Sequence, residues 1–163
     1  MKTISNYRKT FLTLLATSLI TCSFLVACDK DDDDMDDNEK TYTLSGSASG
    51  SNEIPSNTTT GTATLSGTYS AKTNSLSYTI NWTGLSNIVT AAHFHGPAST
   101  TETASPMLDI TIGTNGISGS TTATVTVTDA FESALLSGKI YYNLHTALYV
   151  NGEIRSQVSA TPQ

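Results

Sequence analysis

The amino-acid sequence predicts an all-β domain, an antiparallel β-sandwich or barrel of about eight strands with one short helix. From Thr41 onward the composition shifts to Thr, Ser, Gly, Ala and β-branched residues. Apolar and polar residues alternate there, and clusters of turn residues recur about every eight to twelve positions. The 163-residue chain, 37% hydrophobic, is long enough for one modest core. We therefore expect a single domain over residues 41–163.

Eight segments have the alternation or the β-branched content of strands. In chain order they are Tyr42–Ala48, Thr62–Ser70, Ser75–Trp82, Val89–His95, Met107–Thr111, Thr122–Thr128, Lys139–His145 and Glu153–Val158. Alternate side chains of a strand share one face, and two apolar sets are expected to point into the core. These sets are Leu76, Tyr78, Ile80 and Trp82 in one strand, and Ala123, Val125 and Val127 in another.

A short helix is predicted near residues 129–137, in the segment DAFESALLSG. Asp129 is the expected N-cap, Glu132 takes the capping-box position, and Gly138 ends the helix. The apolar side comprises Phe131, Leu135 and either Ala134 or Leu136. Such a helix is expected to cover one end of the sandwich.

Residues 1–27 have the features of an export signal. Lys2, Arg8 and Lys9 form a basic start, and the mostly apolar run FLTLLATSLITCSFLVA follows. The run is too short and too close to the N-terminus for an ordinary membrane-spanning helix. We therefore expect the mature protein to begin after this segment.

The end of this signal, Leu25-Val26-Ala27-Cys28, resembles the lipobox of bacterial lipoproteins. The resemblance implies cleavage before Cys28 and acylation of that residue, which would anchor the chain to a membrane. The alternative is an ordinary secretory signal cut after Ala27, with an unmodified Cys28. The other cysteine, Cys22, lies in the apolar run, so the mature chain would have no intramolecular disulfide.

Residues 28–40 are expected to be an acidic, disordered tether. The stretch DKDDDDMDDNEK carries eight acidic residues and two lysines and nothing that could bury a core. Like charges repel, so the tether should extend away from the membrane. A lysine followed by acidic residues after the acylated cysteine also resembles the surface-export signal of some bacterial lipoproteins. The expected location is the cell envelope, at the outer membrane and on the cell surface.

The domain from Thr41 onward carries little charge. Lys72, Lys139 and Arg155 are its only bases and stand against six acidic residues, which gives a net charge of −3. Binding of nucleic acid or of anionic lipid requires a basic face. The sequence therefore predicts no nucleic-acid partner.

Three longer segments cover nearly the whole domain: LSGSASGSNEIPSNTTTGTATLSG, YTINWTGLSNIVTAAHFHGPA and LLSGKIYYNLHTALYVNGEIRSQV. They resemble, in the same order, the motifs of the CHRD domain, a family named after the repeats of chordin. Two positions depart from the family pattern: Ser56 replaces a second proline after Pro55, and Ser156 replaces the last glycine of the ending. The resemblance implies an all-β extracellular module but lends no enzymatic activity. The leading functional expectation is thus a non-enzymatic binding or adhesion module with a protein or glycan partner.

The chain's three histidines are its candidate metal ligands. His93 and His95 lie two residues apart on a strand and so share one face, from which both imidazoles can reach one cation. His145 ends a later strand, and it would join them if the two strands were neighbours. Three neutral imidazoles suit Zn²⁺ or Cu²⁺, with water or Glu153 in the fourth position.

Two other roles for the histidines remain open. A buried polar network is one, because Glu153 and Arg155 could pair with each other or with His93 or His95. Acid/base catalysis is the other. The His-x-His strand, the later histidine and the closing Gly-x-x-Arg segment also resemble the copper site of copper/zinc superoxide dismutases, although a fourth histidine and a zinc loop are missing. A metal-binding or redox protein is therefore the alternative function.

Two acidic residues of the domain are not expected to belong to a site. Asp109 is predicted to face solvent from a strand, and Glu53, before Ile54-Pro55, is predicted to be a turn residue. Aromatic residues in strands are expected to be core, so only Tyr149, in a loop, is a candidate for an exposed contact.

Overall fold

The computed structural model describes residues 40–113 and 115–163. The predicted signal segment, Cys28 and the predicted tether lie outside the described residues, apart from Lys40. No helix within the described ranges is long and apolar enough to cross a membrane.

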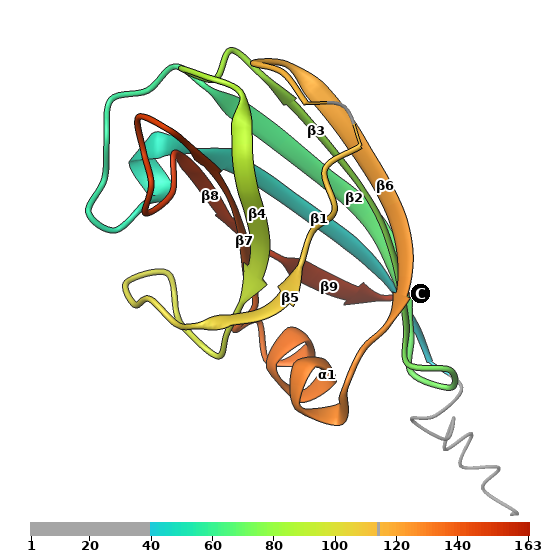
Figure 1. Cartoon of the computed structure of the whole chain (residues 1–163). Coiled ribbons are helices and arrows are strands. Elements are labelled where there is room, and N and C mark those ends of the chain that lie inside the picture. Colours follow the sequence, from blue (N-terminus) through green and yellow to red (C-terminus); the bar gives the residue numbers. More distant parts are fainter. Residues whose placement is uncertain (1–39, 114) are drawn as a thin grey trace, which may run out of the picture. The chain divides into compact units, whose positions relative to one another are not determined.

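The described chain forms nine strands and one α-helix, as Figure 1 shows. The elements are β1 (Thr41–Ser49), β2 (Thr62–Ser70), β3 (Ser75–Thr83), β4 (Val89–His95), β5 (Pro106–Asp109), β6 (Gly119–Thr126), α1 (Asp129–Leu136), β7 (Tyr141–Thr146), β8 (Ile154–Gln157) and β9 (Ser159–Pro162). A single 3₁₀ turn, η2 (Gly50–Asn52), follows β1. The predicted all-β class with one short helix is confirmed.

All nine strands belong to one antiparallel sheet. Their order is β5-β4-β7-β8-β1-β2-β3-β6, and β9 pairs with β1. β2 pairs with β1 on one side and with β3 on the other over its full length of nine residues. The sheet curls into a half-barrel with α1 near one end (Figure 1). Of the two predicted architectures, the molecule therefore adopts the barrel-like one.

The inner side of the curled sheet holds the core. The predicted set in β3, Leu76, Tyr78, Ile80 and Trp82, is buried. Val127 is buried as well, and Ala123 and Val125 pack against the core while partly buried. Each fully buried large apolar side chain contributes about 1.5–3 kcal/mol to folding, so the alternation of these strands fixes which face turns inward.

The helix begins at Asp129, within the predicted range, but its N-cap lies one residue earlier than predicted. Thr128, not Asp129, is the N-cap, because its hydroxyl accepts a hydrogen bond from the backbone N–H of Phe131. This shifts Glu132 out of the capping-box position. Gly138 ends the helix as predicted, with φ of +68°. Phe131, Ala134 and Leu135 are buried, while Leu136 is exposed.

The C-terminal strand β9 was not predicted. The sequence suggests one strand over Glu153–Val158, but the chain changes partner at Val158. β8 pairs with β7 and meets β1 only at Ser49, whereas β9 runs along β1 from Tyr42 to Ser45. The N–H of Gln163 then donates to the carbonyl of Thr41, 2.9 Å away, so the end of β9 lies beside the start of β1.

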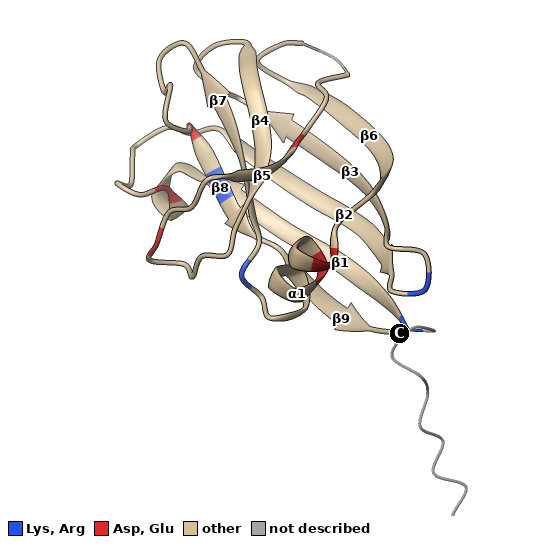
Figure 2. Cartoon of the chain, turned by 60° about the horizontal axis from the view of Figure 1, so that its bottom comes forward, with Lys and Arg blue, Asp and Glu red and all other residues tan. Residues whose placement is uncertain are grey.

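The outer side of the sheet is rich in uncharged polar residues. The outward positions of β2 and β3 hold mainly Ser and Thr, and cross-strand hydroxyl pairs such as Ser77 with Thr124 and Thr79 with Thr122 link β3 to β6. Figure 2 shows only scattered charged residues over the described chain.

Candidate metal centre

Strands β4 and β7 bring the three histidines of the chain together. The two strands are antiparallel neighbours, with His93 opposite Asn143 and His145 opposite Ala91. His95 follows two residues after His93 and so lies on the same face. The sequence alone could not show that these two strands are adjacent, and the structure shows that they are.

The three imidazoles lie on the outer face of the sheet, because the alternating residues Phe94 and Leu144 are buried in the core. His95 and His145 are 7% and 9% exposed. The side chain of His93 is 23% exposed. The cluster is therefore largely buried but open to solvent beside His93.

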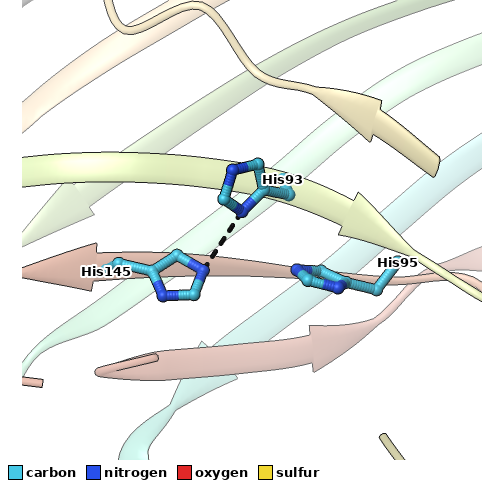
Figure 3. A group of neighbouring side chains, drawn as sticks. All are labelled: His93, His95 and His145. Atoms are coloured by element: carbon cyan, nitrogen blue, oxygen red, sulfur yellow. Dashed lines mark hydrogen bonds between the residues drawn. The ribbon is translucent and has the colours of Figure 1, made fainter. Parts of the chain in front are cut away.

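One ring nitrogen of each histidine faces the other two (Figure 3). The Nδ1 atom of His93 lies 3.2 Å from the Nε2 atom of His145. The three nitrogens, one from each ring, all lie within 4.8 Å of one another. His93 is the central residue, since its ring centroid is 5.4 Å from that of His95 and 5.0 Å from that of His145.

The second ring nitrogen of each histidine faces an oxygen atom. Nδ1 of His145 donates to the carbonyl of Val150 at 3.0 Å. Nδ1 of His95 donates to the carbonyl of Ala104 at 2.9 Å. Nε2 of His93 lies 3.8 Å from a carboxylate oxygen of Asp109. The hydrogen bonds of His145 and His95 are of the kind that fixes the tautomer and the orientation of metal-binding histidines. The contact of His93 with Asp109 is longer than a hydrogen bond.

These contacts determine which ring nitrogens carry a proton when no metal ion is bound. Because Nδ1 of His145 carries a proton, Nε2 of neutral His145 is an acceptor. The 3.2 Å contact is then a hydrogen bond donated by Nδ1 of His93. A metal ion at this position requires the other tautomer of His93, with its proton on Nε2 beside Asp109.

Burial favours the neutral form of two of the rings. It lowers the pKa of His95 and of His145, although the hydrogen bonds to Ala104 and Val150 oppose the shift. Neutral imidazole is the form that binds metal ions. Nε2 of His95 lies 2.9 Å from Oδ1 of Asn143, and this contact also opposes the lowering of the His95 pKa. The contact must break before His95 can bind an ion.

Tyr141 and Arg155 form a stack behind His95. The Tyr141 ring is parallel to the His95 ring, with centroids 4.8 Å apart and an interplanar angle of 2°. The guanidinium carbon of Arg155 lies 3.5 Å from the centroid of the Tyr141 ring, a cation–π contact. Arg155 therefore supports the cluster through Tyr141 and makes no direct contact with a histidine.

Glu153 belongs to a separate buried network. Its carboxylate accepts hydrogen bonds from the hydroxyls of Thr59, Ser86 and Thr146 at 2.6–2.7 Å and from the N–H of Ser86 at 2.7 Å. No ion pair joins it to Arg155 within the described residues. With its oxygens engaged in this way, Glu153 is not available as a fourth ligand.

Three residues near these sites had no predicted role. Asp109 is exposed as predicted, yet it lies beside His93. Asn143 contacts His95, and only the strand order could have revealed this. Glu53, interpreted from the sequence as a turn residue, is buried. The burial of Glu53 was not expected, because Pro55, two residues later, usually marks an exposed turn.

The fold and the site define an all-β module whose one cluster of candidate metal ligands, within the described ranges, is a histidine triad. The family model of the CHRD domain matches residues 44–158. The chain therefore belongs to the CHRD domain family, as its motifs predicted. No curated protein and no solved structure matches it.

Proposed function

We propose that this protein is a non-enzymatic, metal-binding module anchored to the cell envelope by a lipid on Cys28. Membership of the CHRD family supports a binding role without catalysis and nothing finer. The choice of a metal ion as ligand rests on the histidine cluster. From the sequence, a binding or adhesion module is the leading expectation and a metal-binding protein is the alternative. The convergence of the three rings favours the metal-binding alternative.

The carrying observation is the 3.2 Å separation between Nδ1 of His93 and Nε2 of His145. Two nitrogens bound to one tetrahedral zinc ion at 2.0–2.1 Å lie about 3.3 Å apart. These two rings are thus already positioned for a shared ion. His95 completes a three-nitrogen site by a small rotation of its side chain away from Asn143.

The donor set defines the class of ion. Three imidazole nitrogens suit Zn²⁺ and Cu²⁺ and disfavour Ca²⁺ and Mg²⁺, which prefer oxygen ligands. A water molecule would occupy the fourth position. It would enter beside His93, the most exposed of the three rings.

The hydrogen-bond partners favour a metal site over a network that only stabilises the fold. In a purely structural cluster, any acceptor would satisfy each ring. Here the carbonyls of Ala104 and Val150 accept from one ring nitrogen of His95 and His145, and Asp109 lies near that of His93. The remaining nitrogens can meet at one ion once His95 leaves Oδ1 of Asn143. This is the arrangement that orients metal-binding histidines.

The proposed cellular setting follows from the N-terminal sequence. Cys28 would carry the lipid, residues 28–40 would form the extended tether, and the domain would lie at the outer membrane or on the cell surface. Partners there would be proteins or glycans. The scattered charges of the domain give no support for a nucleic-acid partner (Figure 2).

Metal analysis of the full-length chain, purified without a histidine tag, tests the proposal. About one equivalent of zinc or copper is expected after reconstitution and dialysis. The His93→Ala/His95→Ala double variant should bind none. Asn81→Ala, an exposed change on the outer face of β3, is the matched control and should keep the metal. Absence of metal from the reconstituted parent, with a normal circular dichroism spectrum, would contradict the proposal and leave the histidines a structural network.

A further inference from the structure

The two edges of the sheet are built differently. β5 forms one edge and β6 forms the other (Figure 1). Natural proteins keep edge strands from pairing with other chains by short length, proline, charge or a bulge. β5 is four residues long, begins at Pro106 and ends at the exposed Asp109, and its pairing with β4 is irregular between Phe94 and His95. β5 is therefore a protected edge.

β6 has none of these protective features. It is eight residues long, and its sequence GSTTATVT contains no charged residue and no proline. Its pairing with β3 keeps one regular register from Gly119 to Thr126. A long, regular and uncharged edge of this kind is a template for a further strand.

One hydrogen bond shows which backbone groups of β6 face away from the sheet. The N–H of Val127 donates to the carbonyl of Asn74, 2.9 Å away, just beyond the last paired residues of β3 and β6. The backbone groups of successive residues point to opposite sides of a strand, so those of the odd-numbered residues of β6 face β3. Those of the even-numbered residues face away from the sheet.

The open part of this edge runs from Thr122 to Thr126. Near the start of β6, Gly113 lies close to the carbonyl of Ser120 and covers that end. Thr122, Thr124 and Thr126 are exposed. Within residues 40–113 and 115–163, β3 is the only strand that pairs with β6. The outward N–H and C=O groups of these three threonines therefore have no strand to bond.

The segment Thr122–Thr126 is complementary to itself. Its sequence, TATVT, has threonine at every second position in either direction. When two copies run antiparallel with Thr124 opposite Thr124, Thr122 of each copy lies opposite Thr126 of the other. Each such pair can exchange two backbone hydrogen bonds. On the inner side, Ala123 and Val125, which pack partly buried against the core, then lie beside Val125 and Ala123 of the second copy.

We propose that two copies of this chain pair through their β6 edges and form a symmetric dimer with one continuous sheet. Thr124 lies at its two-fold axis. Threonine pairs would line the outer face of the junction and small apolar pairs the inner face, and pairs of both kinds stabilise antiparallel sheets. No charged residue lies in either strand to oppose the contact. The dimer uses no histidine, so it is independent of the metal centre.

The direction of pairing determines where the two tethers leave the dimer. β1 and β6 run antiparallel in each copy, because every neighbouring pair from β1 through β2 and β3 to β6 is antiparallel. Antiparallel pairing of the two β6 strands therefore makes the two β1 strands antiparallel as well. The two chains enter β1 from opposite ends of the dimer. With the proposed anchor on Cys28, on which this step rests, the two copies would belong to facing membranes, as in adhesion between cells.

Disulfide cross-linking of the full-length chain tests the pairing. Thr124→Cys places two thiols opposite each other, with Cα atoms about 5.5 Å apart, which a disulfide can span. The protein is kept in detergent with a chelator and oxidised with diamide, and non-reducing electrophoresis reports the covalent dimer. Thr64→Cys, an exposed change on the outer face of β2, is the matched control. Thr124→Cys should give at least about ten times more dimer than this control, and the parent chain is the blank for Cys22 and Cys28.

Two further cysteine variants test the register. Thr122→Cys and Thr126→Cys lie opposite each other in the dimer, so the two proteins should cross-link when they are mixed. Neither should cross-link when oxidised by itself, because two copies of the same position then lie about 13 Å apart along the strands.

Added charge on the edge tests the pairing in a different way. Thr122→Lys with Thr126→Lys, combined with Thr124→Cys, places like charges opposite each other and should lower the yield of dimer about tenfold. Thr64→Lys with Thr68→Lys adds the same charge to exposed positions of β2, away from the edge, and should leave the yield unchanged.

Three results, each judged on protein with a normal circular dichroism spectrum, would overturn the inference. Equal yields from Thr124→Cys and Thr64→Cys would mean that the β6 edges do not pair. Cross-linking of Thr122→Cys by itself, as strong as with Thr126→Cys, would exclude the antiparallel register. A yield that the edge lysines do not lower would mean that the thiols meet by random collision. None of these results depends on metal or on acylation, so failure of this inference is distinguishable from failure of the proposed function.

Discussion

Nδ1 of His93 and Nε2 of His145 lie 3.2 Å apart, on adjacent antiparallel strands. This distance suits a hydrogen bond between two neutral rings, and it also suits two ligands of one ion. The same pair can therefore exist in two states without movement of the backbone. The predictions that follow concern the choice between these states and the structure that supports it.

Metal removal should destabilise the parent protein and leave the double variant unchanged. A ligand that binds only the folded state, at about a thousand times its Kd, adds about 4 kcal/mol to the free energy of unfolding. Thermal denaturation with and without a chelator measures this difference. If neither the chelator nor added zinc or copper changes the melting temperature of the parent protein, the metal site is refuted.

Zinc affinity should decline in acid, at a pH below about 6.5, the ordinary pKa of histidine. Protons compete with the metal for imidazole. Because burial lowers the pKa of His95 and His145, these rings stay neutral to a lower pH than free histidine does. Competition titrations at several pH values between 8 and 5 provide the test. Affinity that is constant across this range would indicate ligands other than histidine.

Asp109→Asn should weaken metal binding about 10–100-fold, the usual effect of removing an outer partner of a metal-binding histidine. In the metal-bound state the proton of His93 lies on Nε2, facing the Asp109 carboxylate 3.8 Å away. The Asp109 side chain is 92% exposed, so the variant should keep the stability of the parent. Metal titration of both proteins measures the effect.

Glu102→Gln is the control for this charge change, because Glu102 is an exposed acid in the loop between β4 and β5. It should keep the affinity of the parent. Equal losses in both variants would mean that Asp109 acts only through the net charge of the domain.

Glu153→Gln should lower the free energy of unfolding at pH 7 by about 1.5–3 kcal/mol, the value of hydrogen bonds to a charged group. Burial alone would raise the pKa of Glu153, but its hydrogen bonds from Thr146, Thr59 and Ser86 outweigh burial and lower it. A lowered pKa stabilises the fold above the ordinary value of 4.5, and the gain is lost as pH falls through the folded-state pKa. The difference between parent and variant should therefore shrink in acid. Denaturant titrations at pH 7 and pH 3 test this. A difference that grows in acid would mean that folding raises the pKa of Glu153 and does not lower it.

Cys28→Ala should release the protein from the membrane. The predicted acyl chains on Cys28 would provide a firm anchor. No helix in residues 40–113 and 115–163 is long and apolar enough to span a membrane. Cell fractionation with mass spectrometry of the N-terminal peptide measures both location and acylation. Retention of the variant in the membrane fraction would show a different anchor.

Much of the fold followed from local patterns. The limits of β2 and β4 were predicted to the residue, since β-branched alternation there is bounded by clear turn residues. The predicted N-cap was off by one because Thr128 and Asp129 are both good N-caps and only the hydrogen bond decides between them. β9 was missed because its partner, β1, is more than a hundred residues away in the sequence.

The site was less predictable than the fold. The shared face of His93 and His95 follows from strand periodicity alone. Their meeting with His145 depends on the order of strands, which the sequence pattern does not contain. Asp109 reaches His93 because β5 pairs with the other edge of β4. Glu53 lies in a turn as predicted, but its burial was not predicted, because it packs against Asn143 of β7 and Arg155 of β8, far away in the sequence.

The central position of β1 has a mechanical consequence. β1 follows directly after the predicted anchor segment, and it pairs with β2 along its full length and with β8 and β9 on its other edge. Tension between the membrane and a ligand held beyond Ser49 would run along β1. Such a load shears all of its hydrogen bonds together and does not peel them one at a time. We therefore expect the domain to withstand pulling on its tether better than pulling on an edge strand such as β6.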